Sequence, residues 1–463
     1  MKKFMKTQVG RFVAGVLALV IVIAVTVGAN QCDFLKADVT PQKVMSMSQT
    51  SLEIAKALEK DVTISYLATE GGKELWVEEL AKKYADSSDR ITYERVEPTG
   101  SKANQLAVKT GATLAENSIV VACGDRAAAI AAEELYSVVY DQTYLYYYGE
   151  YVTREQYFVA DEQLANAVLY VTRDDLPVVY ALTGHGETTA ASYMREQLRT
   201  SNVVLKTLNL TDEVPSDAAA VLILGPTSDL TDEETQAMFA YLKNGGDLIL
   251  MTSYMMEKLP NLEKITSYYG METVCGVVMD AASGYCASAD YPQYLTPDAA
   301  DHEITNTFYA NGIKPTLSLA GAMKRSMINR SGLTVMELLT TSEQAYMKTS
   351  LNATTLAMEE GDPLGRYTVA MAAEEGDTRI AWYGSSNFMS DNDISVSSGY
   401  NLYLLGNTLS WMMPINERIE IDSGNLMATA MDIPMDQTAL SITLLFVPAI
   451  IALAIGLIVK KKK

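Results

Sequence analysis

Residues 177–187 of this 463-residue chain read PVVYALTGHGE. The first six form a short apolar run, a pattern that predicts a buried β-strand. The next five, Thr183-Gly184-His185-Gly186-Glu187, place two glycines in a tight turn, and a segment with helical periodicity follows. A buried strand that turns directly into a helix is the repeating unit of a parallel α/β sheet. This stretch therefore predicts an α/β fold.

The same unit recurs downstream. Apolar runs of strand length, each ending in polar or glycine-containing sequence, occupy 203–208, 219–224 and 247–251. The helix before the last run begins with Thr231 and Glu234 at capping-box spacing and stops at 244–246, which reads Asn-Gly-Gly. Alternating strands and helices of this kind predict a doubly wound parallel sheet.

This larger domain is predicted to span 177–420. Many small and polar residues at about 255–350 indicate an insertion or accessory subdomain. The α/β pattern resumes with apolar runs at 367–372 and 379–383, and we expect the second of these to rejoin the sheet that begins at Pro177.

A smaller α/β pattern precedes it over 46–136. Strand-like runs alternate with amphipathic helical segments there, and a closing strand pair begins at 119–122. Residues 137–176 then hold a tyrosine-dense stretch and a helix. Because each tyrosine covers apolar area while its hydroxyl stays hydrated, we predict either a linker that packs on another surface or a loop folded over its own domain.

The two ends of the chain predict membrane anchors. Residues 12–28 and 439–459 are apolar runs long enough to cross a bilayer, and both have basic flanks: lysines and Arg11 before the first, lysines 460–463 after the second. We expect a cytoplasmic tail and helix over 1–32 and a second span that returns to a cytoplasmic lysine tail. The protein would then lie in the cell membrane with its body outside the cytoplasm.

Two alternatives concern the first span. Residues 27–29 read Val-Gly-Ala, a passable cleavage site for a signal peptide, in which case the second span alone would anchor the body. Lipidation of Cys32 is less favoured, because the residues before it are not those expected next to a lipidated cysteine. The body lies outside the cytoplasm in either case.

Charge and cysteine spacing exclude several functions. The net charge is −21, and since the two tails carry eight of the positive charges, the rest of the chain carries −29. Such an acidic body repels nucleic acid. The cysteines show no CxxC and no metal-ligand spacing, so we expect no metal and no cofactor. Cys275 and Cys286 either close a short disulfide loop or remain two buried free thiols.

Candidate site residues follow the predicted strands, since ligands bind beyond the carboxyl ends of an open parallel sheet. They are His185, Glu187, Thr227, Ser253, Ser385 and Asn387. His185 and Glu187 invite an acid–base or metal interpretation. However, no serine or cysteine lies in a GxSxG pattern, and no GxxxxGK[ST] phosphate loop is present. A structural turn is the favoured interpretation, a ligand or partner contact comes second, and no residue is assigned as catalytic.

The order of these motifs resembles a known family. The motifs are the helix at 160–167, Thr-Gly-His-Gly-Glu at 183–187, Leu-Ile-Leu-Gly-Pro at 222–226, the capping-box helix at 230–234, and Asn-Gly-Gly-Asp-Leu-Ile-Leu at 244–250. Together with Val96-Glu97-Pro98, they resemble the gliding-motility-type auxiliary subunits of ABC transporters. The resemblance implies a thioredoxin-like domain followed by a domain similar to class-I glutamine amidotransferases. The chain departs from both in having neither a CxxC nor a recognisable Cys-His-Glu triad.

The functional expectation is a non-catalytic, membrane-anchored auxiliary subunit of an ABC-type transport system. The resemblance implies an ABC-type permease and a separate cytoplasmic ATPase as partners. One alternative is an envelope hydrolase or amidotransferase-like enzyme, with Ser253 or Ser385 as the nearest candidate nucleophile. The other is a stand-alone envelope scaffold.

Overall fold

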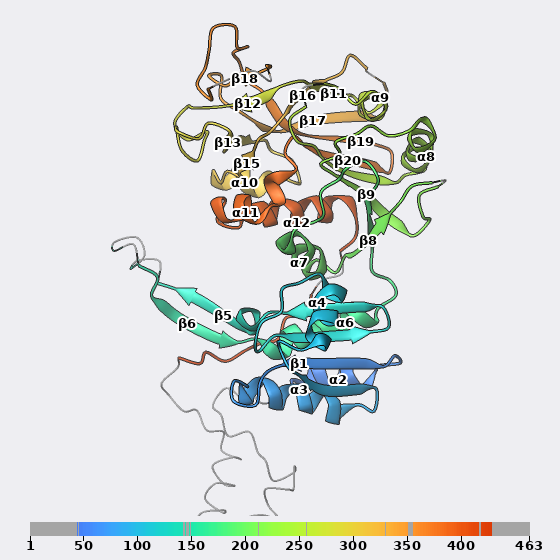
Figure 1. Ribbon diagram of the computed structural model, residues 1–463, viewed down its shortest axis with the longest axis vertical. Coiled ribbons are helices and arrows are strands. Elements are labelled where there is room, and N and C mark those ends of the chain that lie inside the picture. The colour runs from blue at the N-terminus through green and yellow to red at the C-terminus, as the bar shows by residue number, and fades with distance from the viewer. Residues whose placement is uncertain are drawn as a thin grey trace, which may run out of the picture.

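The structure is a computed structural model that describes residues 44 and 46–427, apart from 142–143, 145–147, 149, 212, 256, 329, 351–354 and 416–417. Within these residues the chain forms a small and a large α/β body and a projecting two-stranded arm (Figure 1). No helix in this described part is long and apolar enough to cross a membrane. Both predicted spans, the tails, the possible cleavage site and Cys32 lie outside it.

The small domain is a four-stranded mixed sheet in the order β2-β1-β3-β4. Strand β1 pairs parallel with β2 and antiparallel with β3, which pairs antiparallel with β4. The strands are β1 (Val62–Leu67), β2 (Ile91–Val96), β3 (Ile119–Cys123) and β4 (Arg126–Ile130). The βαβ unit and strand pair read from the sequence are therefore confirmed.

Helices cover both faces of this sheet, because β1 is buried on both sides. Ile64 and Tyr66 face a cluster that includes the apolar sides of α2 (Gln49–Lys56), α3 (Leu75–Ser87) and α6 (Ala160–Thr172). Leu67 faces the other side, where it packs with Ala103 of α4 (Ser101–Thr110). The alternation of side chains along a strand thus gives each helix its own face.

The large domain contains the predicted parallel sheet as its central part. Its parallel strands lie in the order β8-β7-β9-β10-β20: β7 (Val178–Leu182), β8 (Val204–Leu208), β9 (Ala218–Leu224), β10 (Asp247–Met251) and β20 (Thr378–Tyr383). The late strand, β20, does rejoin the sheet. Helices α7 (Ser192–Thr200) and α12 (Tyr400–Met412) cover one face, and α8 (Asp232–Lys243) and α9 (Pro260–Tyr268) cover the other.

Beyond β20 the sheet is antiparallel, which corrects the prediction of a purely parallel sheet. Strand β19 (Thr368–Glu375) pairs antiparallel with β20 and continues to β16 (Ala322–Arg325), β11 (Met271–Val274) and β17 (Leu333–Thr340). The segment at 255–350 is an insertion in sequence, but β11, β16 and β17 extend the main sheet instead of forming a separate subdomain. Their short apolar runs were ambiguous because their partners are distant in sequence.

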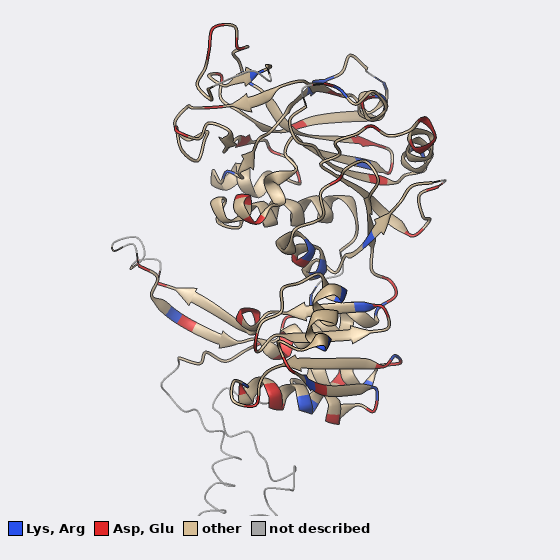
Figure 2. Cartoon of the chain, viewed as in Figure 1, with Lys and Arg blue, Asp and Glu red and all other residues tan. Residues whose placement is uncertain are grey.

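The rest of this region and of the domain edge consists of short elements. They are β12 (Val277–Met279) with β18 (Tyr346–Lys348), β13 (Tyr294–Leu295) with β15 (Leu317–Ser318), β14 (Asp298–Ala299), α10 (Asn306–Asn311) and α11 (Asp391–Val396). Acidic and basic side chains are distributed over both bodies (Figure 2).

The described part of the tyrosine-dense stretch is not folded over its own domain, and its packing on another surface stays a prediction. It belongs to an antiparallel arm of β5 (Tyr136–Tyr140) and β6 (Thr153–Phe158), which projects away from the small domain (Figure 1). The root of the arm is fixed by aromatic packing, with Phe158 lying 5.4 Å from Tyr136 and 6.2 Å from Trp76 between ring centroids. Period-two alternation was hidden because tyrosine occupies both faces of the ribbon.

Both ends of the described chain lie on the small domain. After α12 the chain returns, and Ile419 exchanges two hydrogen bonds with the Asn166 side chain of α6, at 2.8 and 2.9 Å. Leu426 then donates to the carbonyl of Gln156 on β6 at 2.7 Å. At the other end, the amide of Ser48 donates to Asp161 of α6 at 2.8 Å. The large domain is therefore inserted between two chain segments that both contact the small domain, at α6 and the root of the arm.

Candidate functional site

The carboxyl ends of β7, β9, β10 and β20 meet at one edge of the large sheet, as predicted. The amide of Thr227 donates to the carbonyl of His185 at 2.8 Å, which joins the ends of β9 and β7. The hydroxyls of Ser253 and Ser386 lie 2.8 Å apart and join the ends of β10 and β20. Gly225 closes the gap between the pairs, because a Cβ there would lie 3.1 Å from the Ser386 side chain.

His185 is held on both sides by carboxylates. Its Nδ1 lies 3.0 Å from Glu187 Oε1, and its Nε2 lies 3.0 Å from Glu234 Oε2. His185 is only 6% exposed. Glu187 also accepts the backbone amide of His185 at 2.7 Å, so the turn is closed on itself. The predicted pair is therefore a triad, and the third member, Glu234, was seen in the sequence only as a helix cap.

Glu234 performs two tasks at once. It accepts the amide and the hydroxyl of Thr231, each at 2.8 Å, which completes the capping box of α8. Burial opposes its ionisation, but the hydrogen bonds from Thr231 and then from His185 outweigh burial and hold the pKa of Glu234 below its usual value. An ionised Glu234 can therefore stabilise the helix cap and accept a hydrogen bond from the imidazole at the same time.

Both ring nitrogens of His185 are thus engaged by carboxylate oxygens. A general base needs an unprotonated nitrogen within reach of a nucleophile. Among the described hydrogen bonds, none joins a serine of this edge to His185. The arrangement is that of a brace between the β7 turn and the start of α8.

The remaining predicted residues are also engaged. The hydroxyl of Ser385 donates to the carbonyl of Ser318 at 2.6 Å and is completely buried. The amide of Asn387 donates back to the Ser385 hydroxyl at 3.2 Å, so Asn387 contributes its backbone to this contact. Ser386, which was not among the predicted site residues, is the partner of Ser253. Its position directly after Gly384-Ser385 was the available signal.

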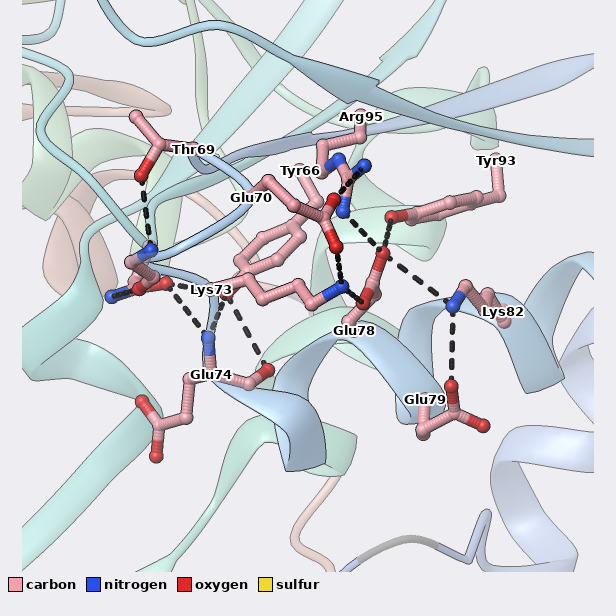
Figure 3. Close-up of polar contacts among 12 residues, drawn as sticks. Tyr66, Thr69, Glu70, Lys73, Glu74, Glu78, Glu79, Lys82, Tyr93 and Arg95 are labelled. Carbon is pink, nitrogen blue, oxygen red and sulfur yellow. Dashed lines mark hydrogen bonds and ion pairs between the residues drawn. The ribbon is translucent and has the colours of Figure 1, made fainter.

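A second polar cluster lies at the start of α3 in the small domain (Figure 3). Glu78 is nearly buried, accepts the hydroxyl of Tyr93 at 3.0 Å, and lies 3.4 Å from both Lys82 and Arg95. Burial opposes its ionisation, but the Tyr93 hydrogen bond and Lys82 outweigh it and lower the pKa of Glu78. Its polar partners compensate its burial, so the cluster fixes α3 against β2. This cluster was not predicted, because Tyr93 and Arg95 reach Glu78 only once β2 and α3 pack together.

A cavity of about 450 Å³ lies between the two domains. It is lined from the small domain by the end of α4 and by β4, and from the large domain by α7 and β8. On its wall, Arg199 donates to Glu196 at 2.8 Å and lies 3.9 Å from Glu134. Burial, and after it the negative charge of Glu196, raise the pKa of Glu134 to about 7. Domain interfaces are frequent ligand sites, but this lining carries both signs of charge and indicates no ligand class.

Metal and disulfide chemistry are not indicated in the described residues. No group of three or more histidine, cysteine, aspartate or glutamate side chains there has the geometry to hold a metal ion. Cys275 and Cys286 are free thiols, so the bridged alternative is wrong; both are half-buried and not fully buried.

Comparisons with known proteins assign no family. No family model matches the chain, and no curated protein matches it. Solved structures with partial likeness include the mmIFT52 N-terminal domain, at 16% identity and a TM-score of 0.39, over 52% of this chain and all of that one. A ThuA-like protein from Parabacteroides merdae is 10% identical, with a TM-score of 0.30, over 53% of this chain and 93% of that one. PurLQS from Thermotoga maritima is 9% identical, with a TM-score of 0.27, over 51% of this chain and all of that one. These scores are too low to carry any argument about fold or function.

Proposed function

We propose that the chain is a non-catalytic, membrane-anchored auxiliary subunit of an ABC-type transport system. Its body lies outside the cytoplasm and binds a substrate or an envelope partner. The apolar runs at 12–28 and 439–459 hold it in the cell membrane beside an ABC-type permease. A separate ATPase on the cytoplasmic face supplies the energy.

The observation that carries the proposal is the bracing of His185 by Glu187 and Glu234. It supports binding over catalysis, because the one histidine at the strand-end edge has both nitrogens engaged. The hydroxyl of Ser385 is turned to a backbone carbonyl, and that of Ser253 to another serine. A hydrolase would need one of these hydroxyls paired with a base, which weighs against the enzyme alternative.

Strand order supports the finer fold proposals. The small-domain order β2-β1-β3-β4, with one parallel and two antiparallel pairs, is similar to that of thioredoxin-like domains. In such domains the segment after β1 carries the redox cysteines, whereas 68–74 here reads Ala-Thr-Glu-Gly-Gly-Lys-Glu. The parallel order β8-β7-β9-β10-β20 with helices on both faces is of the doubly wound type to which amidotransferase-like domains belong. Under this proposal both domains lack the catalytic residues of the folds they resemble, which favours a binding role.

The arrangement of the chain ends supports anchoring on one side. Ser48 and Leu426, near the two ends of the described chain, both hydrogen-bond to the small domain. Two anchors that leave from one domain can enter the same membrane without crossing the large domain. The large domain is then presented away from the membrane, where a partner or substrate has access to it.

The test is affinity purification of the tagged full-length protein in mild detergent, with co-eluting proteins identified by mass spectrometry. We expect a polytopic permease and a P-loop ATPase in stoichiometric amounts. A protein that elutes alone under conditions that preserve other membrane complexes would contradict the proposal and favour a stand-alone scaffold.

A further inference from the structure

The β5–β6 arm exposes apolar surface at the end of β5 and in the described part of the segment that leads to β6. It projects from the small domain (Figure 1), and its outer part carries large side chains that are 39–72% exposed. They are Val139, Tyr140, Tyr144, Tyr148, Tyr151 and Val152. The rings pair with one another, with centroids 5.2 Å apart for Tyr140 and Tyr151 and 4.6 Å apart for Tyr144 and Tyr148. A two-stranded ribbon is at best marginally stable alone in water, so a surface that covers it would stabilise it.

The arm lies close to where the chain leaves for its second apolar run. Leu426 is bonded to Gln156 at the root of the arm, and Asn425 forms a β-bridge with Tyr157. Only residues 428–438 separate this point from the run at 439–459. Eleven residues reach at most about 40 Å when fully extended. The root of the arm is therefore confined to within about 40 Å of the point where that run enters the membrane.

The first apolar run adds a second restraint. Residues 29–47 connect it to Ser48, whose amide is bonded to Asp161 of α6. This tether is longer, with a reach of about 70 Å, but it ends on the same helix. Both tethers therefore attach to the small domain, at α6 and the root of the arm, and neither attaches to the large domain.

The chemistry of the arm fits the interfacial region of a bilayer. Tyrosine has an apolar ring and a polar hydroxyl, and it is enriched where hydrocarbon meets water. The charged residues beside the exposed rings are Asp141, Glu150, Arg154 and Glu155, of which Arg154 lies 3.6 Å from Glu155. Three acidic groups and one basic group disfavour anionic headgroups. Zwitterionic lipid is therefore the fitting surface.

We infer that the β5–β6 arm rests its tyrosines on the extracytoplasmic surface of the phospholipid bilayer and so orients the small domain on the membrane. The inference rests on the proposed function, because it needs the two anchors. It adds a lipid-contacting surface. The arm is then a third point of attachment, and it fixes the orientation of the body relative to the membrane and the permease.

The test places a tryptophan reporter on the arm of the full-length protein in nanodiscs of brominated phosphatidylcholine. Tyr148→Trp is the reporter variant, and Tyr403→Trp on α12 of the large domain is its control, since the two tyrosines are 69% and 68% exposed. The unsubstituted protein gives the background of the three native tryptophans. We expect bromine to quench the added Tyr148→Trp emission at least two-fold and to leave that of Tyr403→Trp unchanged.

Three other outcomes are distinguishable. Equal, negligible quenching of both variants in protein that co-migrates with the discs would overturn the arm inference and leave the proposed anchors intact. Emission of Tyr148→Trp that is blue-shifted but unquenched would also overturn it, since the arm would then be covered by protein. Protein that does not co-migrate with the discs would contradict the anchors, and with them both proposals.

Discussion

Single residues at the strand-end edge have structural roles that their sequence context concealed. His185 lies in a glycine-flanked turn, as expected for either a catalytic or a structural histidine. What decides between them is Glu234, which is 49 residues away in sequence and lies 3.0 Å away in space. A glutamate in a helix cap and a histidine in a turn are each common. Here their contact connects the β7 turn to the start of α8.

Replacing His185 tests this role. His185→Ala removes the nearly buried ring that is hydrogen-bonded to both Glu187 and Glu234, and we expect it to lower the free energy of unfolding by about 3 kcal/mol. Chemical denaturation followed by circular dichroism measures the loss. Tyr193→Ala, at a half-exposed position of the same domain, is the control and should cost less than about 0.5 kcal/mol. Wild-type stability of His185→Ala combined with loss of cellular function would instead indicate chemistry at His185.

Asp247 gives a pH-dependent prediction. Burial at the start of β10 raises the pKa of Asp247 from 3.8 to about 7, although it accepts the Arg379 amide at 2.8 Å. Because the folded state binds this proton more tightly than the unfolded state, stability falls as pH rises from about 4 through 7. Asp247→Asn keeps an acceptor and removes the titration. We expect the variant to match wild type near pH 4 and to exceed it at pH 8 by up to roughly 4 kcal/mol.

Urea denaturation of both proteins at pH 4, 6 and 8 measures this difference. The comparison between the variants removes the contribution of the other titrating groups, which both proteins share. A constant difference across the three pH values would show that folding does not shift the pKa of Asp247.

At the scale of elements, the junction between β20 and the inserted segment holds the large sheet together. Gly384 follows β20 and exchanges backbone hydrogen bonds with two segments: its amide donates to Val369 at 2.8 Å, and its carbonyl accepts from Gly321 at 2.8 Å. A Cβ at Gly384 would lie 2.2 Å from the carbonyl oxygen of Gly321. The glycine is therefore required by a close approach of backbone to backbone and not by an unusual φ angle.

Gly384→Ala tests this junction. The methyl group forces the 320–322 segment away from β20, and we expect a loss of about 2–3 kcal/mol and a lower melting temperature by differential scanning calorimetry. Gly71→Ala is the matched control, because nothing lies within 4 Å of a Cβ there and its φ angle is ordinary. Equal melting temperatures for the two variants would show that the junction adjusts without strain.

The element-scale predictions from sequence succeeded where periodicity and partners were local. The βαβ units around β1 and β7 and the capping box of α8 were read correctly, because strand length, helix caps and glycine stops are properties of adjacent residues. The β5–β6 arm and the antiparallel edge of β11, β16 and β17 were not recognised. The pairing of β11, β16 and β17 depends on residues far away in the chain, which local patterns do not encode, whereas in β5 and β6 the period-two alternation was hidden.

At the scale of the whole molecule, the chain returns to its starting point. The segment at 418–427 runs back along α6 and the root of the arm, so both ends of the body lie on the small domain. This closure brings the segments that lead to the proposed anchors together at α6 and the root of the arm. The nanodisc and co-purification experiments therefore examine one arrangement at two levels, the lipid contact and the protein partner.

The sequence by itself determined the α/β class, the two-domain order, the apolar runs at the chain ends, and the meeting of four strand ends at one edge. These depend on local periodicity and on the rule that parallel strands share an edge. The tertiary structure alone decided that Glu234 reaches His185, that Ser386 pairs with Ser253, and that tyrosines form an arm. The physical reason is that hydrogen bonds and packing act through space, so residues distant in the chain acquire their roles only once the backbone has brought them together.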